Sequence, residues 1–159
     1  MSTNGSSQGQ GVLASIRTDE RVQNLWSSLQ RRAWRSLAVV ALTEDVDTLE
    51  VAELLAKVAS WHEGRSPHVL DLRDLSQRLL DYYKRELQVQ LSTGSRVVVA
   101  LRPVSANPTT LAMTEVADAV IVCVGLGKAA RKAVEATLEA VGRERVVGAL
   151  VFDEDVSKT

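Results

Sequence analysis

Residues 36–43 read SLAVVALT, the link at 44–46 reads EDV, and residues 47–63 read DTLEVAELLAKVASWHE. The first run is continuously apolar, which is typical of a strand buried on both faces of a parallel sheet. In the last run apolar residues recur at spacings of three and four, which predicts a helix with one buried face. Asp47, with Glu50 three residues later, fits the start of this helix, and Gly64 fits its end. The stretch is therefore predicted to be a strand–turn–helix unit of an α/β domain.

The same alternation continues on both sides of this unit. Further strands are expected in HVLDL, RVVVAL, DAVIVCVG and RVVGALVF, at residues 68–72, 96–101, 118–125 and 145–152. Helices are expected between them, at residues 19–33, 73–91, 109–117 and 128–141. Strands that alternate with helices imply right-handed crossovers, so we expect a three-layer fold with a mainly parallel five-stranded sheet and helices on both faces. One domain over residues 18–153 accounts for this pattern, with a disordered tail at 1–17 and a polar tail at 154–159.

Composition narrows the classes of function. The 159 residues carry a formal net charge of −1, which gives no broad electrostatic reason to expect nucleic-acid binding. Cys123 is the only cysteine and lies in an apolar run typical of a buried strand, so neither an intrachain disulfide nor a cysteine zinc site is expected. No apolar run approaches the roughly 18 residues of a membrane helix, and the N-terminus lacks a signal-peptide pattern. We therefore expect a cytoplasmic protein that does not insert into a membrane.

The order of these segments resembles that of a known family. A helix, a strand, a second helix, a strand ending in Asp-Leu-Arg and a strand ending in Pro are followed by ADAVIVCVGLGKAARKAV (117–134) and RVVGALV (145–151). This order is similar to that of the bacterial tyrosine kinases of capsule and exopolysaccharide synthesis, which belong to the MinD/ParA-like group of P-loop ATPases. The resemblance covers most of residues 19–152 and is strongest over 115–151. It implies a P-loop NTPase-like fold.

The sequence departs from the family first at the phosphate-binding loop. Such a loop needs glycines, whose backbone amides surround the phosphates, and a lysine that reaches them. The link after Thr43 has neither, and it is several residues shorter than such a loop. It places Glu44, Asp45 and Asp47 at the helix N-terminus, where carboxylates stabilise the helix dipole themselves and repel a nucleotide. We therefore expect no nucleotide or other cofactor at this position.

The family's metal-linked and base-reading positions also differ. By resemblance, the Asp of the family's D-x-P-P strand falls on Ala100, which cannot organise metal-bound water. The Asn that often follows the family's last strand falls on Phe152. Asp71 and Asp74 both lie near the position of the family's second metal-linked Asp, and we favour a helix-capping role for this Asp. No bound metal ion is expected.

Two tryptophans and three arginines near the first helix have two interpretations. In one, Trp26 and Trp34 seal the edges of the core. In the other, they form an exposed protein interface with Arg31, Arg32 and Arg35, because tryptophan and arginine are enriched at interface hot spots. A solvated helix end with cations near its C-terminus explains the arginines equally well. The sequence does not separate these interpretations.

The departures from the family's motifs lead us to expect a protein without catalytic activity. The family usually ends in a phosphorylated tyrosine-rich tail, whereas this chain ends in VSKT and has its two tyrosines, Tyr82 and Tyr83, in mid-chain. We expect a pseudokinase-like regulatory or scaffolding protein of exopolysaccharide or capsule synthesis. The resemblance implies a chain-length-determining inner-membrane protein or an active kinase homologue as the partner, with self-association as a further option. The alternatives are an active ATPase or tyrosine kinase with an atypical loop, and a MinD/ParA-like partner-binding protein in polarity or secretion.

Overall fold

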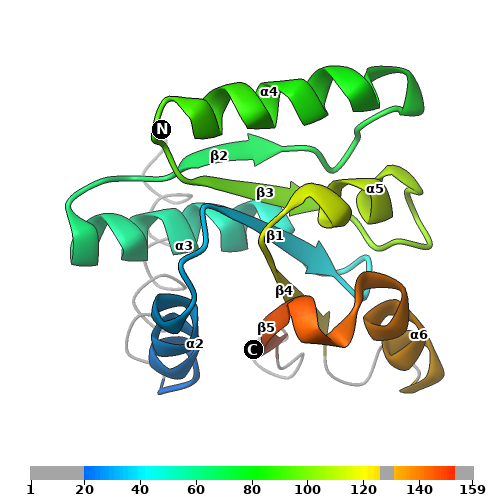
Figure 1. The fold of residues 1–159 in the computed structure, drawn as a ribbon. Helices are drawn as coiled ribbons and strands as arrows, with labels where there is room; N and C mark the ends of the chain where they lie inside the picture. Colours follow the sequence, from blue (N-terminus) through cyan, green and yellow to red (C-terminus); the bar gives the residue numbers. More distant parts are fainter. Residues whose placement is uncertain (1–19, 126–130, 153–159) are drawn as a thin grey trace, which may run out of the picture.

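The computed structural model describes residues 20–125 and 131–152, and its centre is a sheet of five parallel strands (Figure 1). The strands are β1 (Ser36–Ala41), β2 (His68–Asp71), β3 (Val97–Leu101), β4 (Ala119–Gly125) and β5 (Val146–Phe152). They lie in the order β2-β3-β1-β4-β5, and every neighbouring pair is parallel. The predicted fold class, an α/β fold of the P-loop NTPase-like type with a five-stranded parallel sheet, is confirmed.

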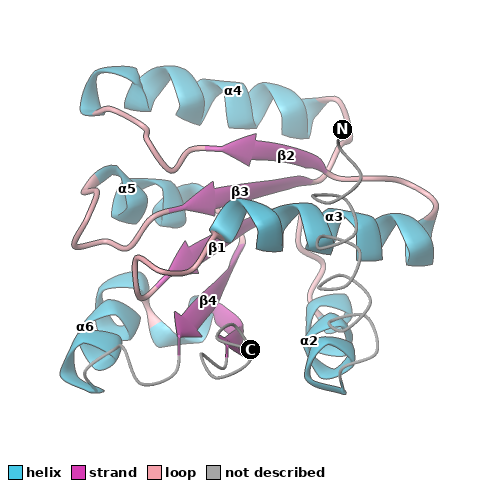
Figure 2. Cartoon of the chain, turned by 180° about the vertical axis from the view of Figure 1, so that it is seen from behind, coloured by secondary structure: helices cyan, strands magenta, loops and turns pink. Residues whose placement is uncertain are grey.

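Helices cover both faces of the sheet (Figures 1 and 2). One face packs against α2 (Glu20–Arg31) and α3 (Thr48–Glu63), and the other packs against α4 (Leu80–Ser92), α5 (Thr109–Val116) and α6 (Arg131–Val141). The central strand β1 shows why this arrangement suits the sequence. Its six residues are all buried, and successive side chains alternate between the two helical layers. A continuous apolar run is what such a strand requires.

The helix after β1 begins and ends where the sequence predicts. The Asp47 carboxylate accepts hydrogen bonds from the backbone N–H groups of Leu49 and Glu50, and so caps the first turn of α3. At the other end Gly64 adopts a φ of 74°, a left-handed conformation that a residue without a Cβ adopts at no steric cost. The Asp47 cap ends the short link between β1 and α3, and the Gly64 cap ends the helix.

The helix predicted at residues 73–91 begins later than expected, with a 3₁₀ turn at Gln77–Leu79 followed by α4. The cause is a pair of long-range hydrogen bonds. The Asn107 side-chain amide donates to the backbone carbonyls of Arg73 and Leu75, at 3.2 Å and 3.0 Å. Those carbonyls are therefore used outside a helix, which the local apolar spacing cannot reveal.

The first helix is held closely against the last strand. A Cβ built on Gly148 of β5 would lie 2.2 Å from Cδ1 of Leu25, which is buried on α2. The pairing of β4 with β5 shifts by one residue between Val120 and Ile121, as in a β-bulge, and this shift places Gly148 opposite Ile121. Gly148 therefore makes room for α2 on this face of the sheet.

Some expectations lie outside the described residues. These are the tails at 1–17 and 154–159 and the start of the last helix at 128–130. Over residues 20–125 and 131–152, no helix is long and apolar enough to cross a membrane.

Candidate functional site

A pocket with a volume of about 430 Å³ opens at the carboxyl ends of β1 and β3. Residues 44–48 line it from the link between β1 and α3, residues 101–103 line it from the end of β3, and Arg73 lines it from the segment after β2. The chain leaves β1 toward one face of the sheet and leaves β3 toward the other. Ligands of open parallel sheets bind at such a switch point, so this pocket is the candidate site.

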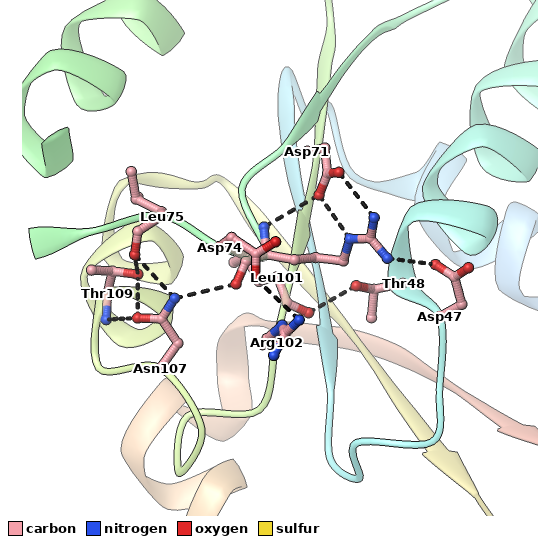
Figure 3. Close-up of polar contacts among 10 residues, drawn as sticks. Asp47, Thr48, Asp71, Asp74, Leu75, Leu101, Arg102, Asn107 and Thr109 are labelled. Carbon is pink, nitrogen blue, oxygen red and sulfur yellow. Dashed lines mark hydrogen bonds and ion pairs between the residues drawn. The ribbon is translucent and has the colours of Figure 1, made fainter.

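The centre of the site is Arg73, whose guanidinium group bridges two carboxylates from different elements. These are the carboxylates of Asp71 and Asp47, which Figure 3 labels. Nε and Nη2 donate to Oδ1 and Oδ2 of Asp71, at 2.8 Å and 3.0 Å. Nη1 donates to Oδ1 of Asp47, at 3.1 Å. Because Asp71 ends β2 and Asp47 begins α3, this Arg73 bridge joins the two elements across the mouth of the pocket.

Electrostatics in this bridge favour the charged forms. The Arg73 side chain, donating to both oxygens of Asp71, lowers the pKa of that carboxyl below its usual value of 3.8, against a smaller opposing effect of burial. In turn, the hydrogen bond to Asp71 raises the pKa of Arg73 above its usual value. Both groups are therefore ionised at neutral pH, and two-pronged arginine–carboxylate pairs are among the stronger charged hydrogen bonds.

The N-terminus of α3 already has an anionic group in place. Asp47 Oδ1 accepts from Leu49 N at 3.0 Å, from Glu50 N at 3.2 Å and from Arg73 Nη1 at 3.1 Å. These backbone amides are of the kind that would bind a phosphate at a helix N-terminus. The predicted self-capping by Asp47 is confirmed.

The rest of the link lies over the end of β4. A Cβ on Gly125 would lie 2.6 Å from Oδ2 of Asp45, and Gly125 N donates to Thr43 Oγ1 at 3.4 Å. Glu44 and Asp45 are exposed at the pocket mouth. The structure thus brings the three predicted carboxylates, those of Glu44, Asp45 and Asp47, to one corner of the sheet.

Two other predicted positions lie elsewhere. Ala100 is fully buried in the core between the sheet and α3, and pairs in register with Asp71 and Val39. Phe152 ends β5 and packs against the same core. Neither side chain lines the pocket. Beside the pocket, Asp74 forms an exposed ion pair with Arg102, with 3.0 Å between its Oδ1 and Arg102 Nη2.

Sequence reasoning missed Arg73 and the residues that hold it. Thr109 Oγ1 donates to Leu75 O at 3.2 Å and contacts Asn107 Oδ1 at 2.8 Å, while Asn107 also binds the Arg73 carbonyl (Figure 3). This network fixes the backbone that follows Arg73, through the carbonyls of Arg73 and Leu75. A signal for the bridge was present in the order Asp-Leu-Arg-Asp at 71–74, where opposite charges lie two residues apart at the end of a strand.

The interpretation of Trp26 and Trp34 as an exposed interface is wrong for these two side chains. Only 5% of Trp26 and 4% of Trp34 is exposed. Trp26 stacks on His62 of α3, with ring centroids 5.2 Å apart, and the Arg96 guanidinium lies 4.6 Å from the centre of the Trp34 ring. Both rings extend the apolar core beneath α2 and α3, which is the alternative that seals the edges of the core.

Arginines of the same region bind backbone carbonyls. Arg32 donates to Glu144 O at 2.7 Å, and Arg35 donates to Leu91 O in the last turn of α4. Arg145, just before β5, donates to the carbonyls of Thr114 and Ala117 at the end of α5. Arg31 is exposed at the end of α2. The predicted contact of Arg31, Arg32 and Arg35 with a partner therefore stays a prediction, and two of the three already have intramolecular roles.

The Asp71 and Asp47 carboxylates do not offer Mg²⁺ a ready set of free oxygens. Both oxygens of Asp71 accept hydrogen bonds from Arg73, and Asp47 Oδ1 already has three donors. Within the residues that the structure describes, no group of three or more histidine, cysteine, aspartate or glutamate side chains is arranged to hold a metal ion. Magnesium sites in phosphate-binding proteins need free carboxylate oxygens and bound water.

The fold and the position of the pocket define a doubly wound α/β domain of the P-loop NTPase-like class. The sequence matches no family model and no curated protein. The fold is similar to that of the solved BceF tyrosine kinase domain, with a TM-score of 0.62 and 12% sequence identity over 89% of this chain and 77% of that chain. At this identity the likeness establishes the fold alone, which is like that of this tyrosine kinase domain.

Proposed function

We propose that this chain is a non-catalytic relative of the bacterial tyrosine kinases, and that it acts by binding a protein partner in exopolysaccharide or capsule synthesis. The observation that carries the proposal is the Arg73 bridge between Asp47 and Asp71, at the corner where P-loop domains hold phosphate groups. The likeness of the fold to the BceF tyrosine kinase domain supports the choice of pathway.

The charges of the corner argue against a bound triphosphate. Three carboxylates, those of Glu44, Asp45 and Asp47, lie within a four-residue segment at the N-terminus of α3. A phosphate placed there would approach these negative charges at short range. It would also have to displace Asp47 from the amides of Leu49 and Glu50, where the carboxylate already interacts favourably with the helix dipole.

The positive charges of the corner are also committed. Arg73 uses three nitrogen donors on Asp47 and Asp71, and Arg102 pairs with Asp74. A nucleotide that recruited Arg73 would leave two carboxylates close together without their shared counter-charge. The loss of this interaction opposes nucleotide binding by a modest amount, because the Asp71 and Asp47 side chains are 43% and 55% exposed.

Nucleotide-dependent thermal unfolding tests the proposal. A ligand at 100 times its dissociation constant adds about 2.7 kcal/mol to the free energy of unfolding, which would raise the Tm of a chain of this size by roughly 5–10 °C. We expect no rise with millimolar Mg-ATP or Mg-ADP. Phosphotyrosine should also be absent by mass spectrometry after incubation with Mg-ATP. A concentration-dependent rise in Tm would overturn the proposed loss of nucleotide binding, and phosphate on Tyr82 or Tyr83 would establish the alternative of an active enzyme.

The partner is tested by binding without nucleotide. The two proposed partners are the cytoplasmic segments of a chain-length-determining membrane protein and an active tyrosine kinase, and either would bring this chain to the inner membrane. We expect saturable binding to one of them in calorimetry, with the same affinity in the presence and absence of Mg-ATP. Failure to bind both would remove the proposed pathway, while the nucleotide test above would stand independently.

A further inference from the structure

The solvent face of α4 carries an apolar stripe. Leu79, Tyr82 and Val89 are large apolar residues with 49%, 58% and 54% of their surface exposed. Tyr82 and Val89, seven residues apart, lie on the side of α4 opposite the buried Leu80, Leu87 and Leu91, and Leu79 is the last residue of the 3₁₀ turn that leads into the helix. Within the described residues, α4 is an outer element, with its inner side on β3 and α5 and its outer side uncovered (Figure 1).

The centre of the stripe is held in place. The Tyr83 ring packs edge-on against Tyr82, with centroids 5.0 Å apart and planes at 89°, and Tyr83 itself contacts the core. An exposed aromatic side chain that is already fixed loses little rotamer freedom when it is covered. Aromatic residues in such positions are enriched at the centres of interfaces.

The charges beside the stripe are self-complementary. Asp81 and Arg85 are exposed on the same flank of α4, four residues apart. When a two-fold axis perpendicular to both helices relates two antiparallel copies, the same flank of each helix faces the other copy. The numbers of any two residues that face each other then add up to the same total. In one such register Leu79 lies within one residue of the level of Val89 of the second copy. Asp81 likewise lies within one residue of the level of Arg85 of the second copy, and one residue is an offset of about 1.5 Å along the helix axis. In the same register Tyr82 lies level with Arg85 of the second copy, a favourable cation–π pairing.

From this match we propose that α4 is a self-association surface, on which two copies of the chain pack their α4 helices antiparallel. The area is that of a single helix face about 20 Å long, which is small for a protein interface. The dimer should therefore be weak and concentration-dependent. This surface shares no residue with the Arg73 bridge and does not depend on the proposed loss of catalysis.

Sedimentation equilibrium of the full chain tests the surface. We expect reversible monomer–dimer exchange over a roughly hundredfold range of concentration, because a small interface gives a weak dimer. Val89→Glu and Leu79→Glu should each leave the chain monomeric with an unchanged circular dichroism spectrum, since both side chains are exposed. Ala136→Glu, which adds the same charge to an exposed position of α6, is the control and should dimerise like the parent.

A charge swap tests whether the occupant of the surface is a second copy of the chain, and whether the two helices pack in the proposed register. Asp81→Lys or Arg85→Glu alone places like charges opposite each other twice across the two-fold axis, and should raise the dissociation constant roughly tenfold. The double variant Asp81→Lys/Arg85→Glu restores both ion pairs but loses the Tyr82–Arg85 contact, so it should recover most of the affinity that either single variant loses. A monomeric parent, a dimer that survives Val89→Glu, or a double variant no better than the singles would each overturn the proposal.

Discussion

Arg73 lies between Asp71 and Asp47, with Nε 2.8 Å from Oδ1 of the first and Nη1 3.1 Å from Oδ1 of the second. The two carboxylates belong to the end of β2 and the start of α3, which are adjacent only in the folded chain. The bridge therefore contributes to the fold as well as to the chemistry of the pocket, and its contribution can be measured.

Arg73→Gln should lower the free energy of unfolding by about 1 kcal/mol, a value reduced by the partial exposure of all three side chains. Urea unfolding followed by circular dichroism measures the change. Arg102→Gln, which removes only an ion pair with the largely exposed Asp74, is the matched control and should change stability by less than about 0.5 kcal/mol. Equal effects of the two variants would mean that the bridge has no special role.

The bridge should also give the stability of the domain a specific pH dependence. The folded-state pKa of Asp71 lies below its usual 3.8, so its stabilising effect is present above the unfolded pKa and is lost as the pH falls through the folded value. Arg73 stays charged in both states over this range. The difference in unfolding free energy between the parent and Asp71→Asn should be constant above about pH 5 and shrink below about pH 4. A constant difference down to pH 2 would contradict this assignment.

Gly148→Ala should destabilise the packing of α2 on β5. The new methyl group would lie 2.2 Å from Leu25 Cδ1, and overpacking of this kind costs about 1–3 kcal/mol. Because Leu25→Ala removes the clashing atoms, the double variant should lose at least about 0.5 kcal/mol less than the sum of the singles. Ala149→Val, at the exposed neighbouring position, serves as the control and should be nearly neutral. Additive single effects would show that the two residues are not coupled.

The thiol of Cys123 should be unreactive in the folded protein. Burial in β4 raises its pKa to about 12, so at pH 8 almost no thiolate is present and reagents have no access. Labelling with a disulfide reagent should therefore proceed at the rate of unfolding and accelerate in urea. A comparison thiol introduced by Ala140→Cys on the exposed face of α6 should react within the mixing time. Equally fast labelling of Cys123 would contradict its burial.

The fold was predictable because its main signals are local. Five apolar runs separated by helical spacing indicate a parallel sheet, and the structure places all five runs in one. The later start of α4 was not predictable, because it depends on Asn107, which lies more than thirty residues from the carbonyls that it binds. Periodicity describes neighbours in sequence, and this bond joins neighbours in space.

The candidate site was predictable only in part. The carboxylates at 44–47 could be placed at a helix N-terminus from the sequence alone, and they lie there. The order Asp-Leu-Arg-Asp offered a signal for the pairing of Arg73 with Asp71, but the contact of Arg73 with Asp47 could not be predicted, because it depends on the end of β2 lying beside the start of α3. The exposed interface built on Trp26 and Trp34 failed for a related reason, since composition does not distinguish a tryptophan that covers the core from one that faces solvent.

The guanidinium–carbonyl bonds of Arg32, Arg35 and Arg145 have a consequence for the kinetics of folding. The Arg32 bond spans 112 positions of the sequence, the Arg35 bond spans 56, and the two Arg145 bonds span 31 and 28. Each bond therefore requires a long segment of chain to be ordered first. Contacts of this kind are expected to form after the rate-limiting step. Replacing Arg35 or Arg145 by Met should then accelerate unfolding in a chevron experiment and leave the refolding limb nearly unchanged. These arginines would thus determine how long a folded molecule persists, and hardly how fast a new one forms.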